Sequence, residues 1–333
     1  MVERLVGLQA QEPPDPYVGL WSRIHGFRPQ ELSDLIEGRR AVRAQLMRGT
    51  IHLVSQRDLL SIQPLTLPVL AGQFRSVFAK QLGAATVLEH VVEAGRELLA
   101  QAPRTRAELG RLLAARWPDT EPSVLGHAVA HHLPLVQLPP RGQWGRSGPA
   151  TLALTSDWVA GEAQPDIDRL VLRYLAAFGP ASAADVRTWS RLTGLRPVIE
   201  RLRPGLRTFR DERGRELLDV PDGPLPDPDT PAPPRFLPQY DNAALSHDDR
   251  TRILGGARWP FGTPGGLVGS VLVDGFYRAP WRLDGSTLRV EGFALLPREG
   301  RGVAAAVRAE GEALVNILRP DDPGRRVELL APA

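Results

Sequence analysis

The chain has 333 residues and contains no cysteine, which excludes disulfide bonds, thiolate catalysis and zinc sites built on cysteine. Lysine is nearly absent too: Lys80 is the only one, so any chemistry through a lysine Schiff base would depend on that residue. No apolar run reaches the roughly 18 residues that span a membrane, and no charged-then-apolar leader is visible. A soluble, cytoplasmic protein that does not act at a membrane fits these absences.

Common catalytic and metal-binding patterns are also missing. There is no P-loop and no Gly-x-Ser-x-Gly elbow. His127, His131 and His132 share one predicted helix, but without cysteine or HExxH spacing we expect packing or phosphate contact there rather than a metal site. Segment 236–254 contains three aspartates, Asp241, Asp248 and Asp249. Two of them are expected to cap a helix that starts near residue 247, rather than to catalyse. The sequence therefore predicts no metal and no cofactor.

The charge is unevenly distributed along the chain. The formal net charge is only +3, and the pI near 9.7 reflects how few groups titrate between pH 7 and 10. Between Arg23 and Arg57 there are seven arginines against three acids, whereas between Glu200 and Asp229 there are six against eight. A GC-rich genome would explain arginine in place of lysine, but not this asymmetry. We therefore expect an electrostatic footprint for phosphates in the amino-terminal part.

Two segments share one pattern. In 101–118 and again in 177–192, a proline break leads into a capping box, formed by Thr105 and Glu108 in the first and by Ser182 and Asp185 in the second, and then into a short helix. An apolar helix precedes each (86–100 and 167–178), another helical stretch follows (122–133 and 194–202), and a hairpin pattern closes each (133–158 and 207–220). Three helices followed by a β-hairpin are typical of the winged helix, a variant of the helix-turn-helix.

The start of the chain fits the same plan, with helices expected near 29–37 and 40–47 and an extended segment at 50–54. A Pro-rich connection at 219–234 leads to several β runs, a helix at 301–320 and a final strand from 326. We expect an α+β fold of three tandem winged-helix units (residues 1–80, 81–160 and 161–222) plus a C-terminal, β-rich α+β element (235–333). Tandem winged helices imply nucleic-acid binding, but they do not imply catalysis.

The stretch RLVGLQAQEPPDP (residues 4–16) combines an apolar run with two neutral amides. Leu5, Val6 and Leu8 predict the end of a buried helix, which the following prolines stop. Gln9 and Gln11 lie two residues apart at this boundary. On local sequence alone they are capping or surface glutamines, since amides commonly satisfy backbone groups near helix ends.

The chain nevertheless resembles the winged-helix DNA glycosylases of the AlkZ and YcaQ type over nearly its whole length. The matching segments are LVGLQAQ, PYVGLWSRIHGF, RAQLMRGTIHLVSQRD, RGQWGRSGP, FGPASAADVRTWS, LPQYDNAALSHDDR and VLVDGFYRAPWR. This resemblance implies three winged helices around a concave DNA-binding channel, with an additional β element. It also implies that Gln9 and Gln11 are catalytic, because they match the family's motif of Gln, an aliphatic residue, then Gln or Asp. The two-glutamine form is that of the AlkZ-like branch, and Ala10 is small for the middle position.

The resemblance implies a monofunctional DNA glycosylase that excises N7-alkylguanine from double-stranded DNA and unhooks interstrand crosslinks, in alkylation repair or self-resistance. Such a base is cationic, so its glycosidic bond is weakened and the sugar develops oxocarbenium character, as in glycoside hydrolysis. A glutamine carbonyl can accept from a water and lie against the cationic sugar, and two could hold one water between them. Neutral damaged bases should be poor substrates. We expect no lyase step, because Lys80 is the only lysine.

Further residues are candidates for contacts with DNA. His52 matches a histidine that the resemblance places beside the site, and the alternative is a satisfied histidine at a strand edge. Tyr240, Asp241 and Arg250 match another family segment, for which a structural role is favoured over a DNA-facing one. The candidates for backbone or groove contacts are Arg23, Arg43, Arg48, Arg141, Trp144 and Arg146.

The alternative function is that of a non-catalytic winged-helix DNA-binding protein, either a regulator or a lesion sensor. A regulator should prefer one sequence through contacts with base edges worth about 1–3 kcal/mol each, whereas a glycosylase should bind undamaged DNA weakly and without preference. Binding that falls with salt is expected of both. In either case we expect a monomer in the cytoplasm, associated with the nucleoid.

Overall fold

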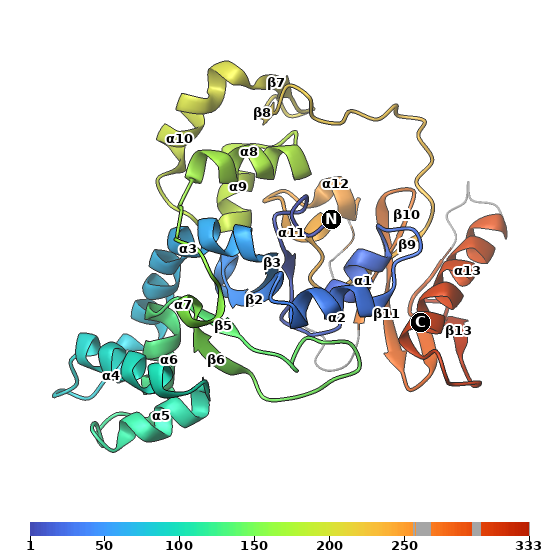
Figure 1. Cartoon of the computed structure of the whole chain (residues 1–333). Coiled ribbons are helices and arrows are strands. Elements are labelled where there is room, and N and C mark those ends of the chain that lie inside the picture. The colour runs from blue at the N-terminus through green and yellow to red at the C-terminus, as the bar shows by residue number, and fades with distance from the viewer. Residues whose placement is uncertain (256, 258–267, 295–300, 333) are drawn as a thin grey trace. The chain divides into compact units, whose positions relative to one another are not determined.

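The computed structural model describes residues 1–255, 257, 268–294 and 301–332. The chain divides into two compact lobes. The large lobe holds Met1–Pro13 and Arg28–Gly223, and the small lobe holds Pro14–Phe27 and Pro224–Ala333. Each lobe combines helices with β-sheet, so the expected mixture of α and β structure is confirmed (Figure 1). Within the described ranges no helix has the length and hydropathy needed to cross a membrane.

A six-stranded sheet with antiparallel neighbours lies in the large lobe, in the order β1-β3-β2-β5-β6-β4. Its strands are β1 (Leu8–Gln9), β2 (Ala41–Gln45), β3 (Ile51–Ser55), β4 (Arg104–Thr105), β5 (Leu135–Gln137) and β6 (Thr151–Leu154). The helices between these strands are α2 (Pro29–Glu37), η1 (Met47–Gly49), α3 (Gln56–Val77), η2 (Ala79–Gln81), α4 (Leu88–Gln101), α5 (Arg106–Ala114) and α6 (Pro122–His132), and α7 (Thr155–Trp158) follows β6.

The remainder of the large lobe is mainly helical. It contains α8 (Ile167–Phe178), α9 (Ala183–Ser190), α10 (Leu195–Leu202), η3 (Arg203–Gly205) and a separate hairpin of β7 (Arg207–Arg210) and β8 (Glu216–Asp219). Tyr174 and Trp189 from this part pack in one hydrophobic cluster with Val42 and Val54 of the sheet. A second cluster joins α3, α4, α5 and α6 around Phe74 and Leu125. The first of these cores packs α8 and α9 against β2 and β3, the strands beside β1 in the sheet order.

The small lobe is built on a five-stranded sheet in the order β13-β12-β11-β10-β9. Its strands are β9 (Arg235–Pro238), β10 (Val268–Val273), β11 (Phe276–Asp284), β12 (Thr287–Val290) and β13 (Arg326–Leu329), and only the β12–β13 pair is parallel. Its helices are α1 (Asp15–Trp21), α11 (Asn242–Leu245), α12 (Thr251–Leu254) and α13 (Arg301–Leu318). Residues 14–27 thus pack with the carboxyl-terminal sheet although they lie in the first third of the chain, which the sequence pattern does not reveal.

Most of the expected elements are confirmed. The helices expected at 29–37, 86–100, 122–133, 167–178, 194–202 and 301–320 form with small shifts at their ends, as do the extended segment at 50–54 and the last strand. Both expected capping boxes are present, with reciprocal bonds between Thr105 and Glu108 and between Ser182 and Asp185. The expected hairpins form as the pairs β5–β6 and β7–β8.

The helix expected near 40–47 is wrong, because Ala41–Gln45 forms strand β2. This strand pairs with β3 on one side and β5 on the other, and its first four residues are buried. Alanine, arginine and glutamine favour a helix, but a central position in a sheet overrides that weak preference.

The helix end expected at Leu5–Leu8 is also wrong. Residues 2–6 form a turn, and the backbone is left-handed at Val6 (φ 53°) and Gly7 (φ 94°) before β1 begins. A Cβ atom at Gly7 would lie 2.7 Å from Cγ1 of Val54, so glycine permits the turn to approach β3 closely. The two glutamines therefore follow a turn and an edge strand rather than a helix.

Candidate active site

Gln9 and Gln11 both lie against strand β3. Gln9 faces His52 across the β1–β3 ladder, and the next residue continues the pairing through Ala10 N–H, which donates to Ile51 O at 2.7 Å. Gln11 then accepts a hydrogen bond from Ile51 N–H to its Oε1 at 3.3 Å. The two side chains differ in environment, since Gln9 is only 7% exposed whereas Gln11 is exposed.

Arg48 connects Gln9 with His52. Its Nη2 donates to Gln9 Oε1 at 2.8 Å and lies 3.1 Å from His52 Nε2, while its Nη1 donates to Trp189 O at 2.7 Å. The structure therefore brings together three residues that the sequence analysis proposed separately, and Trp189 anchors them to α9. Arg48 is a residue of η1 with a left-handed backbone (φ 57°), and Gln73 Nε2 supports it from α3 by donating to Arg48 O at 3.1 Å.

The hydrogen bonds of His52 define its protonation state. Its Nδ1 lies 3.0 Å from Thr50 O, and since a carbonyl can only accept, Nδ1 carries the proton. The Nε2 atom is then an acceptor for Arg48. Burial, and secondly the charge of Arg48, lower the pKa of His52 to about 3. His52 is therefore neutral at physiological pH and serves as a fixed acceptor in this network.

Arg43 supports the backbone between Gln9 and Gln11. Its side chain is buried, and Nη2 donates to Ala10 O at 2.8 Å and to Gln137 Oε1 at 3.4 Å. Gly142 approaches it so closely that a Cβ there would lie 2.4 Å from Arg43 Cδ. The guanidinium thus holds the backbone between the two glutamines.

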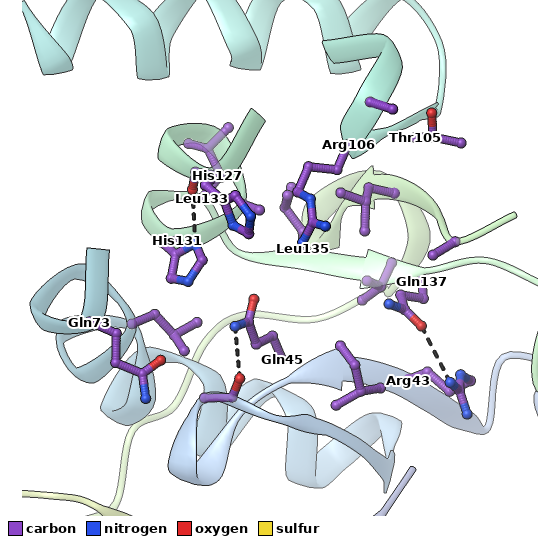
Figure 2. A pocket seen from close by; sticks show the side chains of 18 of the residues that line it. Arg43, Gln45, Gln73, Thr105, Arg106, His127, His131, Leu133, Leu135 and Gln137 are labelled. Atoms are coloured by element: carbon purple, nitrogen blue, oxygen red, sulfur yellow. Dashed lines mark hydrogen bonds between the residues drawn. The ribbon is translucent and has the colours of Figure 1, made fainter. Parts of the chain in front are cut away.

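A cavity of about 1150 Å³ opens beside Gln11 in the large lobe. Its walls come from β2, β5, α3, α5 and α6, and Figure 2 shows the side chains that project into it. Gln11 lines this cavity, whereas Gln9 is not among the described residues that do. Its other polar lining residues are Arg43, Gln45, Gln63, Gln73, Thr105, Arg106, Ser123, His127, His131, Gln137 and Arg141. Of these, only Arg43, Arg141, His127, His131 and the capping residue Thr105 stood out in the sequence.

The three candidates between β5 and β6 have different surroundings. Arg141 lines the cavity and donates from Nη1 to Gly148 O at 3.1 Å. The backbone N–H of Trp144 donates to Ser33 Oγ at 2.9 Å, which ties this loop to α2. Arg146 is exposed.

The other four candidates belong to the small lobe. Arg23 forms a two-bond ion pair with Asp241, with Nη2–Oδ1 at 2.6 Å and Nη1–Oδ2 at 2.9 Å. Asp241 is buried and also caps α11 by accepting from Ala243 N–H at 2.8 Å, so it has the structural role that the sequence favoured. The single helix expected from residue 247 is instead the two short helices α11 and α12. Tyr240 and Arg250 are half-buried, and Arg250 directly precedes α12.

The histidines of α6 pack against aromatic side chains. His127 stacks on Phe78 with ring centroids 4.1 Å apart, and the rings of Phe74 and His132 meet edge to face at 5.1 Å. Burial, and secondly the charge of Arg106, lower the pKa of His127 to about 4, so its imidazole is neutral at physiological pH. Among the described residues no group of three or more His, Cys, Asp or Glu side chains is placed to hold a metal ion.

Comparisons with known proteins agree with this architecture. The model of the family described as "DNA glycosylase AlkZ-like" matches residues 2–317. A solved structure of Streptomyces sahachiroi DNA glycosylase AlkZ superposes with a TM-score of 0.69 at 21% sequence identity, covering 100% of this chain and 92% of that chain. No curated protein sequence matches the chain. The chain therefore belongs to the AlkZ-like DNA glycosylase family.

Proposed function

We propose that the protein is a monofunctional DNA glycosylase that excises N7-alkylguanine from double-stranded DNA through a water positioned by Gln9 and Gln11. The observation that carries this proposal is the fixing of the Gln-Ala-Gln segment. Arg48 holds the Gln9 amide, Arg43 holds the Ala10 carbonyl, and the side chain of Gln11 is left exposed at a cavity. Such fixation is what an orienting site requires.

The reaction needs no group that takes up a proton from the leaving base. In an N7-alkylguanine nucleotide the C1′–N9 bond breaks with its electron pair moving onto the cationic purine, which leaves as a neutral base. The water oxygen bonds to C1′, and the proton it loses passes to solvent. Glutamine cannot accept that proton at neutral pH, but its amide can orient the water and face the oxocarbenium-like sugar. Neutral damaged bases lack this built-in activation and should react poorly.

The two glutamines have different roles in this proposal. Gln9 Oε1 already accepts from Arg48, whose positive charge opposes an approaching oxocarbenium ion. Gln11 is further along the chain, exposed and uncharged, and its NH2 group has no partner among the described residues. We therefore assign the contact with sugar and water chiefly to Gln11. Gln9 fixes the strand and offers its second lone pair to the same water.

We infer three tandem winged-helix units that form a concave channel for DNA, and the element order supports the second and third of these units. Helices α4, α5 and α6 precede the β5–β6 pair, and α8, α9 and α10 precede the β7–β8 hairpin, which is the three-helix and wing order. Arg141, Trp144 and Arg146 lie in the long connection between β5 and β6, where a wing would contact the DNA backbone or a groove. Tyr240 and Arg250 are further candidates. Arg43 is buried, Arg23 and Arg48 are partly buried, and the hydrogen bonds of all three within the protein support positioning roles. The protein is proposed to act as a monomer.

A lyase step is not part of the proposal. Lys80 is exposed in η2 and is not one of the described residues that line the cavity. Without an amine beside the sugar, the reaction should stop at an abasic site. The cavity volume leaves room for a substituent larger than methyl, which supports bulky adducts and crosslinks as substrates, in repair or self-resistance.

The test is release of free base from duplex DNA that carries one 7-methylguanine or one N7-linked crosslink. The native chain should release base and leave an alkali-labile abasic site. The Gln9→Ala/Gln11→Ala variant should bind the same DNA but release no base, and Gln81→Ala, which changes an exposed glutamine of η2, should act like the native chain. If the native chain released base from neither substrate, catalysis would be refuted and a non-catalytic DNA-binding protein would remain.

A further inference from the structure

The cavity beside Gln11 carries polar groups that the proposed reaction does not use. Arg43, Arg106 and Arg141 line it, and none of the described lining residues is acidic. We propose that this cavity binds the departing guanine base, with Gln45, Gln73 and Arg106 as its hydrogen-bonding groups. The inference rests on the proposed function, because it gives a place to the base that the reaction releases.

Two glutamines present fixed acceptors. Gln45 Nε2 donates to Gly49 O at 2.8 Å, and Gln73 Nε2 donates to Arg48 O at 3.1 Å. Since only the NH2 end of an amide can donate to a carbonyl, these bonds determine which end of each side chain is the oxygen. Each Oε1 atom has no hydrogen-bond partner within the described ranges. Both glutamines can therefore receive N–H groups of a ligand without losing the bonds that hold them.

Donors come from two other residues. Arg106 begins α5 and extends into the cavity, where its guanidinium has neither an ion pair nor a hydrogen bond in the part of the chain that the structure describes (Figure 2). Gln137 uses its Oε1 to accept from Arg43 at 3.4 Å, which leaves its NH2 group as a donor. In the view of Figure 2, Gln73 and Gln137 lie on opposite sides, with Gln45 and Arg106 between them.

This set of groups matches guanine better than adenine. The guanine edge offers O6 as an acceptor beside the N1–H and N2–H2 donors. The O6 atom would accept from an arginine or amide donor of the cavity, and the two donors would bind the two glutamine oxygens. An adenine derivative would place the N1 lone pair against an oxygen acceptor. Apolar side chains complete the lining for the faces of a flat ring, among them Leu67, Leu70 and Leu133. The volume of about 1150 Å³ holds a purine with a substituent, since pockets for drug-sized ligands measure about 300–1,000 Å³.

The charge of the cavity favours the released base over the bound nucleotide. Its three arginines repel a cationic N7-alkylguanine, and no carboxylate among the described lining residues offsets them. As the C1′–N9 bond breaks, the bonding electron pair neutralises the purine and this repulsion disappears. The interaction therefore improves along the reaction coordinate, which is the condition for an interaction to accelerate it.

The experiment is calorimetric titration of the full chain with free 7-methylguanine and, separately, with free 3-methyladenine. We expect saturable binding of 7-methylguanine and at least about tenfold weaker binding of 3-methyladenine. Gln45→Leu and Arg106→Gln should each weaken 7-methylguanine binding about five- to tenfold, the effect of one lost hydrogen bond. Gln81→Leu is the matched control, because Gln81 Nε2 also donates to a backbone carbonyl four residues away, Val77 O, but lies outside the cavity lining.

The inference is overturned if the native chain does not bind 7-methylguanine, or if both variants bind it as the native chain does. Arg106 is exposed, so Arg106→Gln stays informative even if Gln45→Leu lowers stability. Excision from duplex DNA, measured on the same preparations, separates this result from the proposed function. A native chain that excises the base but does not bind it free refutes only the cavity assignment. A chain that binds the base but excises nothing refutes the glycosylase.

Discussion

Replacing Arg48 with methionine tests whether this arginine positions the glutamine pair. Methionine keeps a long apolar stem but removes the hydrogen bonds to Gln9, His52 and the backbone of α9. Hydrogen bonds that involve a charged group contribute roughly 1.5–3 kcal/mol each. A small displacement of an orienting group lowers the rate of a reaction about 100-fold. We therefore expect kcat for base excision to fall about 100-fold and KM to change little, because Gln9 is buried and should not determine DNA affinity.

The assay combines single-turnover excision of 7-methylguanine with NMR titration of the histidines. After burial, Arg48 is the second cause of the low pKa of His52, so the pKa should rise from about 3 toward its ordinary value when the arginine is removed. A role that is only structural would not predict a change in kcat together with this rise. The two readouts therefore separate positioning from general destabilisation.

Arg191→Met is the matched control for Arg48→Met. Arg191 also has a left-handed backbone (φ 62°), at the end of α9, but its side chain is exposed. It should leave both excision and the His52 titration unchanged. Arg48 does not position the glutamine pair if Arg48→Met folds normally and keeps its rate within about threefold of the native rate.

Substitutions at three other positions should measurably change the free energy of unfolding. Arg173→Met leaves a buried carboxylate of α3 unpaired and should lower the free energy of unfolding by about 3–5 kcal/mol in urea titrations, whereas Arg201→Met breaks an exposed ion pair and should have little effect. His52→Gln should flatten the pH dependence of the free energy of unfolding. In the native sequence, His52 is protonated below about pH 6.5 when the chain is unfolded, but its pKa of about 3 keeps it neutral in the folded state. The stability of the native chain therefore falls as the pH drops from about 6.5 toward 3. An unchanged pH profile would refute it. Gly95→Ala should cost about 1–3 kcal/mol in the same titrations, because the new Cβ would lie 2.3 Å from a methyl group of α6.

Sequence patterns predicted the elements whose signals are local. The capping boxes at Thr105 and Ser182, the hairpins and α13 depend on neighbouring residues, and all of them form. Strand β2 was missed because its residue types favour a helix and its central position comes from pairing on both sides, with the nearby β3 and with β5, which is distant in the sequence. The packing of residues 14–27 with the small lobe was missed for the same reason. Its key contact pairs Arg23 with Asp241, and nothing local to either residue indicates it.

The candidate site was predictable in its residues but not in their relations. Gln9, Arg48 and His52 were all named from the sequence, yet Arg48 was expected at a phosphate and not on the glutamine. The cavity glutamines Gln45 and Gln73 gave no signal, because isolated glutamines in a strand and a helix are common surface residues. Only the fold shows that each uses its Nε2 on the backbone, while its Oε1 has no hydrogen-bond partner among the described residues.

Several arginines serve as internal supports for the amino-terminal segment, which changes how its charge should be interpreted. Strand β1 has only two residues and pairs with β3 alone, so its own ladder is short. Arg43 donates to Ala10 O, and Arg173 donates to Glu3 O while it pairs with an aspartate. A guanidinium can bind several acceptors at once in a fixed geometry, which the compact ammonium of lysine cannot reproduce. The use of arginine instead of lysine therefore stabilises the amino-terminal segment, because these guanidinium groups bind its backbone carbonyls. Since some arginines between residues 23 and 57 are engaged in this way, their number overestimates the number of phosphates that this region can contact.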